Sequence, residues 1–266
     1  MLGDVTFGQY YDARSFMHKV DPRVKILLLI AYITAVFLAK NFLALAAVLF
    51  FLIVAVIFSS VPVGSVLKSI KAIYILIIFT ATLNVLFYVK KEGDTVLFWV
   101  VTKEGLINAA FLASRLILLV TGSSLLTLTT TPVSLTDGLE SLLKPLTFIK
   151  FPVHELALVM SIALRFIPTL ANETDRIMSA QKARGANFDS GNIFKRLKAL
   201  TTILIPLLIS AFRRADELGD AMDARCYTGS KIRTKYKKLK FSFRDPIAIL
   251  FTAAMITVVV LLGIYF

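Results

Sequence analysis

The amino-acid sequence predicts an all-α integral membrane protein, with about five transmembrane helices and three long cytoplasmic or interfacial helices. The first observation is composition: 57% of the 266 residues are apolar and the mean hydropathy is +0.78, against roughly 45–50% apolar residues in soluble domains. The second observation is the formal charge of +13, because 131–244 holds 19 Lys and Arg against 10 Asp and Glu. Such a basic segment between membrane spans indicates the cytoplasmic side.

Five apolar runs are long enough to cross a hydrocarbon core of about 30 Å. Asp21 is placed to cap the first helix, with Pro22 at its first position. Lys40 and Asn41 separate the first two runs, which favours a tight hairpin over one very long helix. The expected spans are 22–39, 41–58, 70–89, 105–130 and 246–266. Five crossings place the N-terminus and 131–244 in the cytoplasm and the C-terminus outside.

The basic charge also bears on partners. In a chain made mostly of apolar runs, it indicates anionic lipid head groups and acidic protein surfaces rather than nucleic acid. We therefore expect a lipid membrane as partner and no nucleic acid. Cys226 is the one cysteine of the sequence, so an intrachain disulfide is excluded.

Arg115 lies inside the fourth expected span. A charged residue near the centre of a membrane costs roughly 2.5–3.5 kcal/mol, so it needs a partner or a place in the interior of the bundle. We favour a buried arginine bonded to carbonyl groups or to a polar group such as Asn84. An intramembrane contact with a second protein, or a gating pair, remains the alternative.

Segment 131–244 predicts three helices. Ser134 to Asp137 resembles a capping box, and the leucines that follow share one face, as expected of a helix along the inner membrane surface or under the bundle: Leu135, Leu139, Leu142, Leu143 and Leu146. The next two helices, 153–183 and 193–224, each have an apolar half and a charged half, with Pro168 and Pro206 as expected kinks. Neither holds about 20 uninterrupted apolar residues, so we do not count them as ordinary spans.

A duplicated element ends these two helices. The stretch from Asp175 to Gly185 recurs 41 positions later, with five matching positions: an Asp, an aliphatic residue, two alanines and an Arg. On a helix, these alanines permit close approach of a partner, and the Arg at the end can bind a carboxylate or exposed carbonyls. The helix dipole alone also favours a terminal Arg, but it does not explain five matched positions. The repeat therefore predicts two equivalent sockets on partner proteins.

The sequence resembles EcfT, the transmembrane coupling component of energy-coupling factor (ECF) importers of vitamins and metals. The resemblance rests on the Ala-Arg motifs, on Asp21-Pro22-Arg23 and on the Ala-Leu-Arg-Phe-Ile-Pro run at 163–168. It implies a bacterial cell-membrane complex with two cytoplasmic ABC-type ATPases and a small membrane substrate-binding subunit. The ATPase-docking residues that it implies are Ala183, Arg184, Gly185, Ala224, Arg225 and Cys226.

Cys226 departs from the glycine that the family pattern has at this position. A residue other than glycine disfavours positive φ. The resemblance therefore leaves open whether the second helix ends in the same left-handed turn, and Gly229 is close enough to provide that turn later.

The expected domains are an N-terminal membrane domain with four transmembrane helices at 1–130, a cytoplasmic coupling domain at 131–244 and a final transmembrane helix at 245–266. We expect no enzymatic activity in this chain, and no catalytic, cofactor-binding or metal-binding residues. The sequence has no G-x-x-x-x-G-K-[ST] loop for ATP and no H-E-x-x-H or G-x-S-x-G motif. A self-sufficient secondary transporter is the alternative, but it should show paired intramembrane charges.

Overall fold

The computed structural model describes residues 10–13, 15–87, 96–98, 101–186, 193–227, 229 and 241–265. Its contacts divide the chain into two units. The membrane unit comprises Gly8–Val153 and Leu239–Phe266, and the arm unit comprises Met1–Phe7 and His154–Lys238. Residues 231–240, a basic tract that holds six of the 19 Lys and Arg of segment 131–244, lie outside the described residues. The predicted all-α membrane fold is confirmed, with one short hairpin added.

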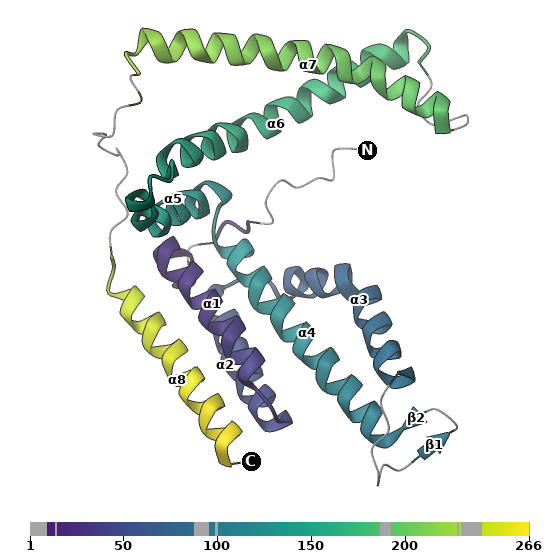
Figure 1. Ribbon diagram of the computed structural model, residues 1–266, viewed down its shortest axis with the longest axis vertical. Coiled ribbons are helices and arrows are strands. Elements are labelled where there is room, and N and C mark those ends of the chain that lie inside the picture. Colours follow the sequence, from purple (N-terminus) through teal and green to yellow (C-terminus); the bar gives the residue numbers. More distant parts are fainter. Residues whose placement is uncertain are drawn as a thin grey trace. The chain divides into compact units, whose positions relative to one another are not determined.

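The elements of the membrane unit follow the expected order along the chain (Figure 1). They are η1 (Met17–Lys19), α1 (Pro22–Leu38), α2 (Phe42–Ser59), α3 (Val63–Leu86), β1 (Val96–Phe98), β2 (Val101–Thr102), α4 (Lys103–Thr129), α5 (Pro132–Leu143), η2 (Lys144–Ile149) and α8 (Arg244–Tyr265). The strands β1 and β2 pair antiparallel between α3 and α4. The cap of α1 is as predicted, because the Asp21 side chain accepts a hydrogen bond from the Arg23 N–H.

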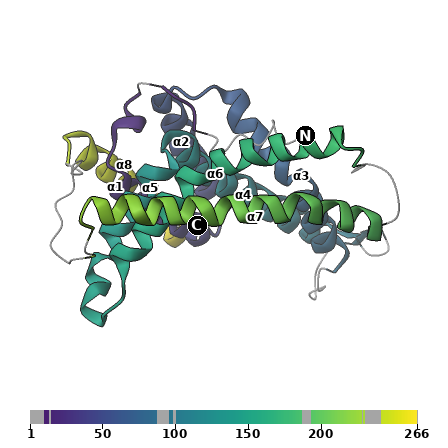
Figure 2. The same ribbon diagram turned by 90° about the horizontal axis from the view of Figure 1, so that it is seen from above.

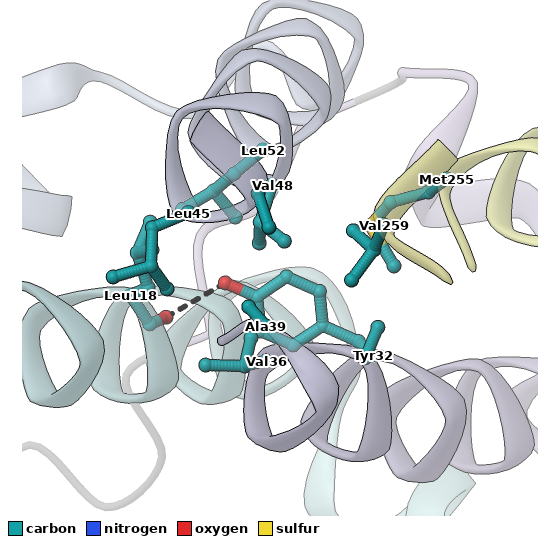
Figure 3. Packing of buried hydrophobic residues seen from close by; sticks show 11 residues of the cluster. Tyr32, Val36, Ala39, Leu45, Val48, Leu52, Leu118, Met255 and Val259 are labelled. Atoms are coloured by element: carbon teal, nitrogen blue, oxygen red, sulfur yellow. Dashed lines mark hydrogen bonds between the residues drawn. The ribbon is translucent and has the colours of Figure 1, made fainter. Parts of the chain in front are cut away.

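The core of the membrane unit lies between α1, α2, α4 and α8 (Figure 3). Val36, Val48 and Val259 are 0% exposed. The Tyr32 hydroxyl donates a hydrogen bond of 2.8 Å to the Leu118 carbonyl. Gly122 makes room for the Tyr32 ring, which a side chain at that position would overlap. These four helices therefore share a buried apolar core, in which the Tyr32 hydroxyl is hydrogen-bonded.

Three details differ from the sequence predictions. α3 begins at Val63, earlier than the expected span 70–89, so Lys68 lies inside the helix rather than before it. The cap of α5 is Thr131, not Ser134, because Thr131 accepts the Ser134 N–H and Pro132 takes the first position. The buried positions of α5 are its small residues, while the leucine face stays partly exposed.

Five of the described helices are long and apolar enough to cross a membrane: α2, α3, α4, α6 and α8. This set differs from the expected one in two members. α1 has only 17 residues, and α6 qualifies because its charged residues are concentrated in its second half.

The arm unit is built on two long helices, α6 (Val153–Ala183) and α7 (Ile193–Ala224), which Figure 2 shows from above. Both helices have the predicted bounds. Pro168 and Pro206 lie inside them without ending them.

Candidate docking site

The first terminal turn ends α6 at the residues that the sequence singled out. Gly185 adopts φ +88°, and its N–H donates to the Lys182 carbonyl at 3.0 Å. The Ala186 N–H donates to the Gln181 carbonyl at 3.0 Å. This pair of bonds is a Schellman turn, which satisfies carbonyls that a helix end otherwise leaves open. Arg184 stands exposed on it.

The second terminal turn ends α7 in the same way. Cys226 adopts φ +55°, and its N–H donates to the Asp223 carbonyl at 2.8 Å. The Tyr227 N–H donates to the Met222 carbonyl at 3.0 Å. The left-handed residue is therefore Cys226 itself, and Gly229 is not needed for this turn. The two turns, 183–185 and 224–226, are called the tips below.

The alanines of both repeats lie open beside the arginines. Ala180 and Ala183 on α6 are exposed, as are Ala221 and Ala224 on α7. Since small side chains let another backbone approach closely, each tip presents a smooth helix flank that ends in a guanidinium. The structure thus gives the two motifs one shared local geometry.

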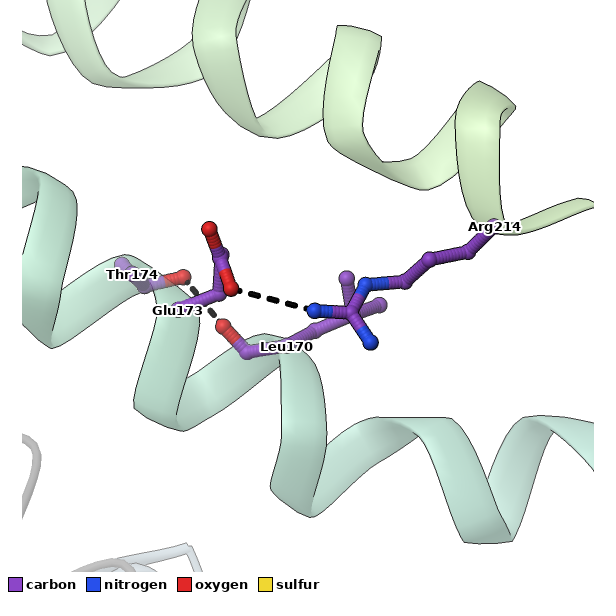
Figure 4. Close-up of polar contacts among 4 residues, drawn as sticks. All are labelled: Leu170, Glu173, Thr174 and Arg214. Atoms are coloured by element: carbon purple, nitrogen blue, oxygen red, sulfur yellow. Dashed lines mark hydrogen bonds and ion pairs between the residues drawn. The ribbon is translucent and has the colours of Figure 1, made fainter.

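An ion pair that we did not predict joins the two helices of the arm unit, α6 and α7, which are called the arms below (Figure 4). Arg214 on α7 donates to the Glu173 carboxylate on α6 at 3.1 Å, and both side chains are half-buried. The two residues are 41 positions apart, the displacement of the repeat, so they are equivalent positions of the duplicated sequence. The repeat does not locate this contact, because equivalent positions of a repeat meet only if the two helices pack side by side at that point.

The apolar middle of α7 is left uncovered by the described residues. Leu204, Leu208 and Phe212 are 59%, 58% and 63% exposed, and Ile203 is the buried exception. A stripe of this size on a helix ordinarily marks a contact with another protein or with lipid. On α7, the tip is therefore a polar end and this stripe an apolar middle.

Arg115 is bonded inside the membrane unit. It donates to the Ala39 carbonyl at 2.6 Å, and its guanidinium lies 4.7 Å from the centre of the Phe111 ring. Carbonyl bonding was the favoured interpretation, whereas the Asn84 amide donates to the Thr80 carbonyl instead. The Phe111 ring, with the Phe37 ring at 6.0 Å, adds cation–π stabilisation to this partly buried charge.

No cluster of three or more His, Cys, Asp or Glu that could hold a metal ion occurs among the described residues.

Comparisons with known proteins identify the family of this chain. Residues 13–236 match the family model CbiQ, described as "Cobalt transport protein". A protein of Clostridium kluyveri called "Energy-coupling factor transporter transmembrane protein EcfT" is 49% identical over 268 residues, covering 100% of this chain and 99% of its own. The protein of the same name from Bacillus subtilis is 42% identical, covering 100% and 98%. This chain therefore belongs to the EcfT family, the transmembrane components of energy-coupling factor transporters.

Proposed function

We propose that this chain is a non-catalytic coupling subunit, which links ATP hydrolysis by two cytoplasmic ABC-type ATPases to uptake of a vitamin or other micronutrient. The substrate would pass through a separate, small substrate-binding membrane subunit. The observation that carries this proposal is the duplicated tip: two helices end in the same Schellman turn with an exposed Arg184 or Arg225. Two like tips fit two like ATPases.

The docking residues of this proposal are Ala183, Arg184 and Gly185 on one tip, and Ala224, Arg225 and Cys226 on the other. A guanidinium can form two parallel bonds with a carboxylate, or bond the open carbonyls at a helix end. The hydrogen-bonded turns restrict the backbone under each arginine, which lowers the entropy lost on binding. The alanine flanks would enter a groove of the ATPase.

The proposed topology follows from charge. The N-terminus and 131–244 face the cytoplasm, where the ATPases are, and the C-terminus faces outward. In this proposal, 1–130 and 245–266 form the membrane anchor and 131–244 the coupling domain. The exposed apolar stripe of α7 then suits a neighbouring membrane subunit.

The alternative of a self-sufficient secondary transporter finds little support in the membrane unit. Its apolar cavity of about 110 Å³ lies between α1, α2, α4 and α8, and the charged residue in its lining is Lys25. The Lys25 ammonium already donates to two oxygens of the chain. A substrate path driven by an ion gradient would need charges available for a substrate or ion.

The test is co-purification of the chain with its two ATPases, combined with uptake into proteoliposomes. Arg184→Glu combined with Arg225→Glu should remove the ATPases and abolish ATP-driven uptake. Arg176→Glu combined with Arg213→Glu is the matched control, because these arginines are exposed on the same helices but lie outside the tips. Normal ATPase retention and uptake in the tip variant would refute the proposal.

A further inference from the structure

The start of α1 contacts both ends of segment 131–244. The five residues Asp21–Lys25, called the seat below, meet the end of α4, the face of α5 and the start of α8. Segment 131–244 follows α4 and ends where α8 begins, and its first part, α5 and η2, belongs to the membrane unit. The seat therefore lies beside both ends of segment 131–244.

Lys25 binds the end of α4, directly before segment 131–244 begins. Its side chain is 8% exposed, and its ammonium donates to the Thr129 carbonyl and to the Thr130 hydroxyl, both at 2.9 Å. Thr129 is the last residue of α4, and the next residue after Thr130 caps α5. A buried ammonium with two acceptors fixes this junction, since losing either partner would leave a polar group unsatisfied.

Pro22 supports α5. A Cβ placed on Gly138 would come within 3.1 Å of the Pro22 Cβ and 3.2 Å of the Pro22 backbone carbon. A side chain at this position would therefore require α5 or the seat to shift by a few tenths of an ångström. Gly138, one of the two buried residues of α5, makes this contact.

Asp245, at the start of α8, binds the end of segment 131–244 to the seat. It is 0% exposed, and its carboxylate accepts the Asp21 N–H at 2.9 Å and the Ser242 N–H at 2.6 Å. Two charge-assisted bonds from different parts of the chain hold the start of α8 against the start of α1. The Asp245 charge also attracts the Lys25 ammonium.

We propose that the seat is a joint that fixes both ends of segment 131–244 to α1, with Lys25, Gly138 and Asp245 as positioning residues for energy coupling. If both ends are held, displacement of the arms must move α1, α4 and α8 together. If one end slips, ATP hydrolysis continues but less of the displacement reaches the membrane unit. This inference rests on the proposed function and adds the point at which motion enters the membrane.

The test measures uptake per ATP hydrolysed by the complete complex in proteoliposomes. Lys25→Met and Gly138→Ala should keep both ATPases bound and retain hydrolysis, while uptake per ATP falls about fivefold or more, the size of an ordinary coupling energy. Lys25→Arg should restore most of the ratio, because it keeps a buried cationic donor. Gly64→Ala is the matched control, since a Cβ there meets nothing within 4 Å.

The outcomes separate the two proposals. Loss of the ATPases from the wild-type complex would count against the proposed function, whereas bound ATPases with an unchanged ratio in both seat variants would refute the joint alone. If Lys25→Met does not fold, Gly138→Ala decides by the same ratio.

A structural readout completes the test. Spin labels at Thr127→Cys and Ile247→Cys, two exposed positions on α4 and α8, are measured on the full chain with Cys226→Ser. Lys25→Gln should broaden their distance distribution, and Lys25→Arg should keep it narrow. An unchanged distribution in Lys25→Gln would overturn the joint.

Discussion

The membrane unit and the arm unit use the same apolar residue types for opposite purposes. In the membrane unit, Val36, Val48 and Val259 pack against one another, away from lipid and water. On α7, residues of similar size stand open along the middle of the helix. Both units expose apolar side chains, but the membrane unit also has a buried core of its own, whereas only Ile203 is buried among the described residues of α7. We expect the exposed apolar residues of α7 to contact other molecules. The predictions below test this division.

The largest effect is expected from a carboxylate in the core of the membrane unit. Val48→Asp places a charge inside α2, where a charged residue costs roughly 2.5–3.5 kcal/mol, and should remove most folded protein. Leu208→Asp on α7 should leave the chain folded but weaken its association with partner subunits. Size-exclusion chromatography of the purified chain and co-purification of partners measure the two effects. Aggregation of Leu208→Asp to the same extent would contradict the division.

Replacing the arginine should weaken ATPase binding equally at the two tips. Because both turns have the same hydrogen bonds, Arg184→Glu and Arg225→Glu should each weaken ATPase binding by about 2 kcal/mol, the value for a strong interface residue. Titration of each variant with purified ATPase measures this affinity. An effect at one tip and none at the other would mean that the shared geometry serves only one contact.

A smaller effect is expected at the pair between the arms. Exposed or half-exposed ion pairs contribute about 0.2–1 kcal/mol, so Glu173→Gln should barely change thermal stability. Glu173→Arg sets two like charges against each other and should reduce uptake more than Glu173→Gln does. Adding Arg214→Glu should restore uptake by exchanging the charges. Without such recovery, the pair would be irrelevant to coupling.

The smallest effect concerns the left-handed residue of the second tip. Cys226→Gly should stabilise this turn by about 0.5 kcal/mol, since relief of strain exceeds the added entropy of glycine. Gly185→Ala should destabilise the first turn by a similar amount. Hydrogen exchange of the Cys226 and Tyr227 amides detects such local changes. Faster exchange in Cys226→Gly would contradict this account.

Local patterns were sufficient to predict several elements. The bounds of α6 and α7 and the cap of α1 are confirmed, because periodicity and capping residues act over a few positions. Because glycine is favoured in left-handed turns, the sequence left open whether Cys226 or Gly229 would form the turn after α7. The hydrogen bonds at the end of α7 hold Cys226 in the left-handed conformation. The predicted capping box at Ser134 was wrong, because Thr131, three positions earlier, caps α5 and Pro132 is its first residue.

Long-range partners were the part that sequence could not supply. Nothing near Arg115 in the chain indicates Ala39, and nothing near Lys25 indicates Thr129. Such contacts depend on how helices pack, which hydropathy does not determine. The docking role of the tips remains a prediction, although their geometry is now described.

The ion pair between the arms has a mechanical consequence. Arg184 and Arg225 each lie 11 residues beyond the paired residue of their own helix, about 16 Å of helix at 1.5 Å per residue. Equal forces applied at Arg184 and Arg225 would therefore exert equal torques about the ion pair. If each ATPase binds one of these arginines, equal displacements by both would leave the ion pair in place. A displacement by one ATPase alone would rotate α6 and α7 about the ion pair.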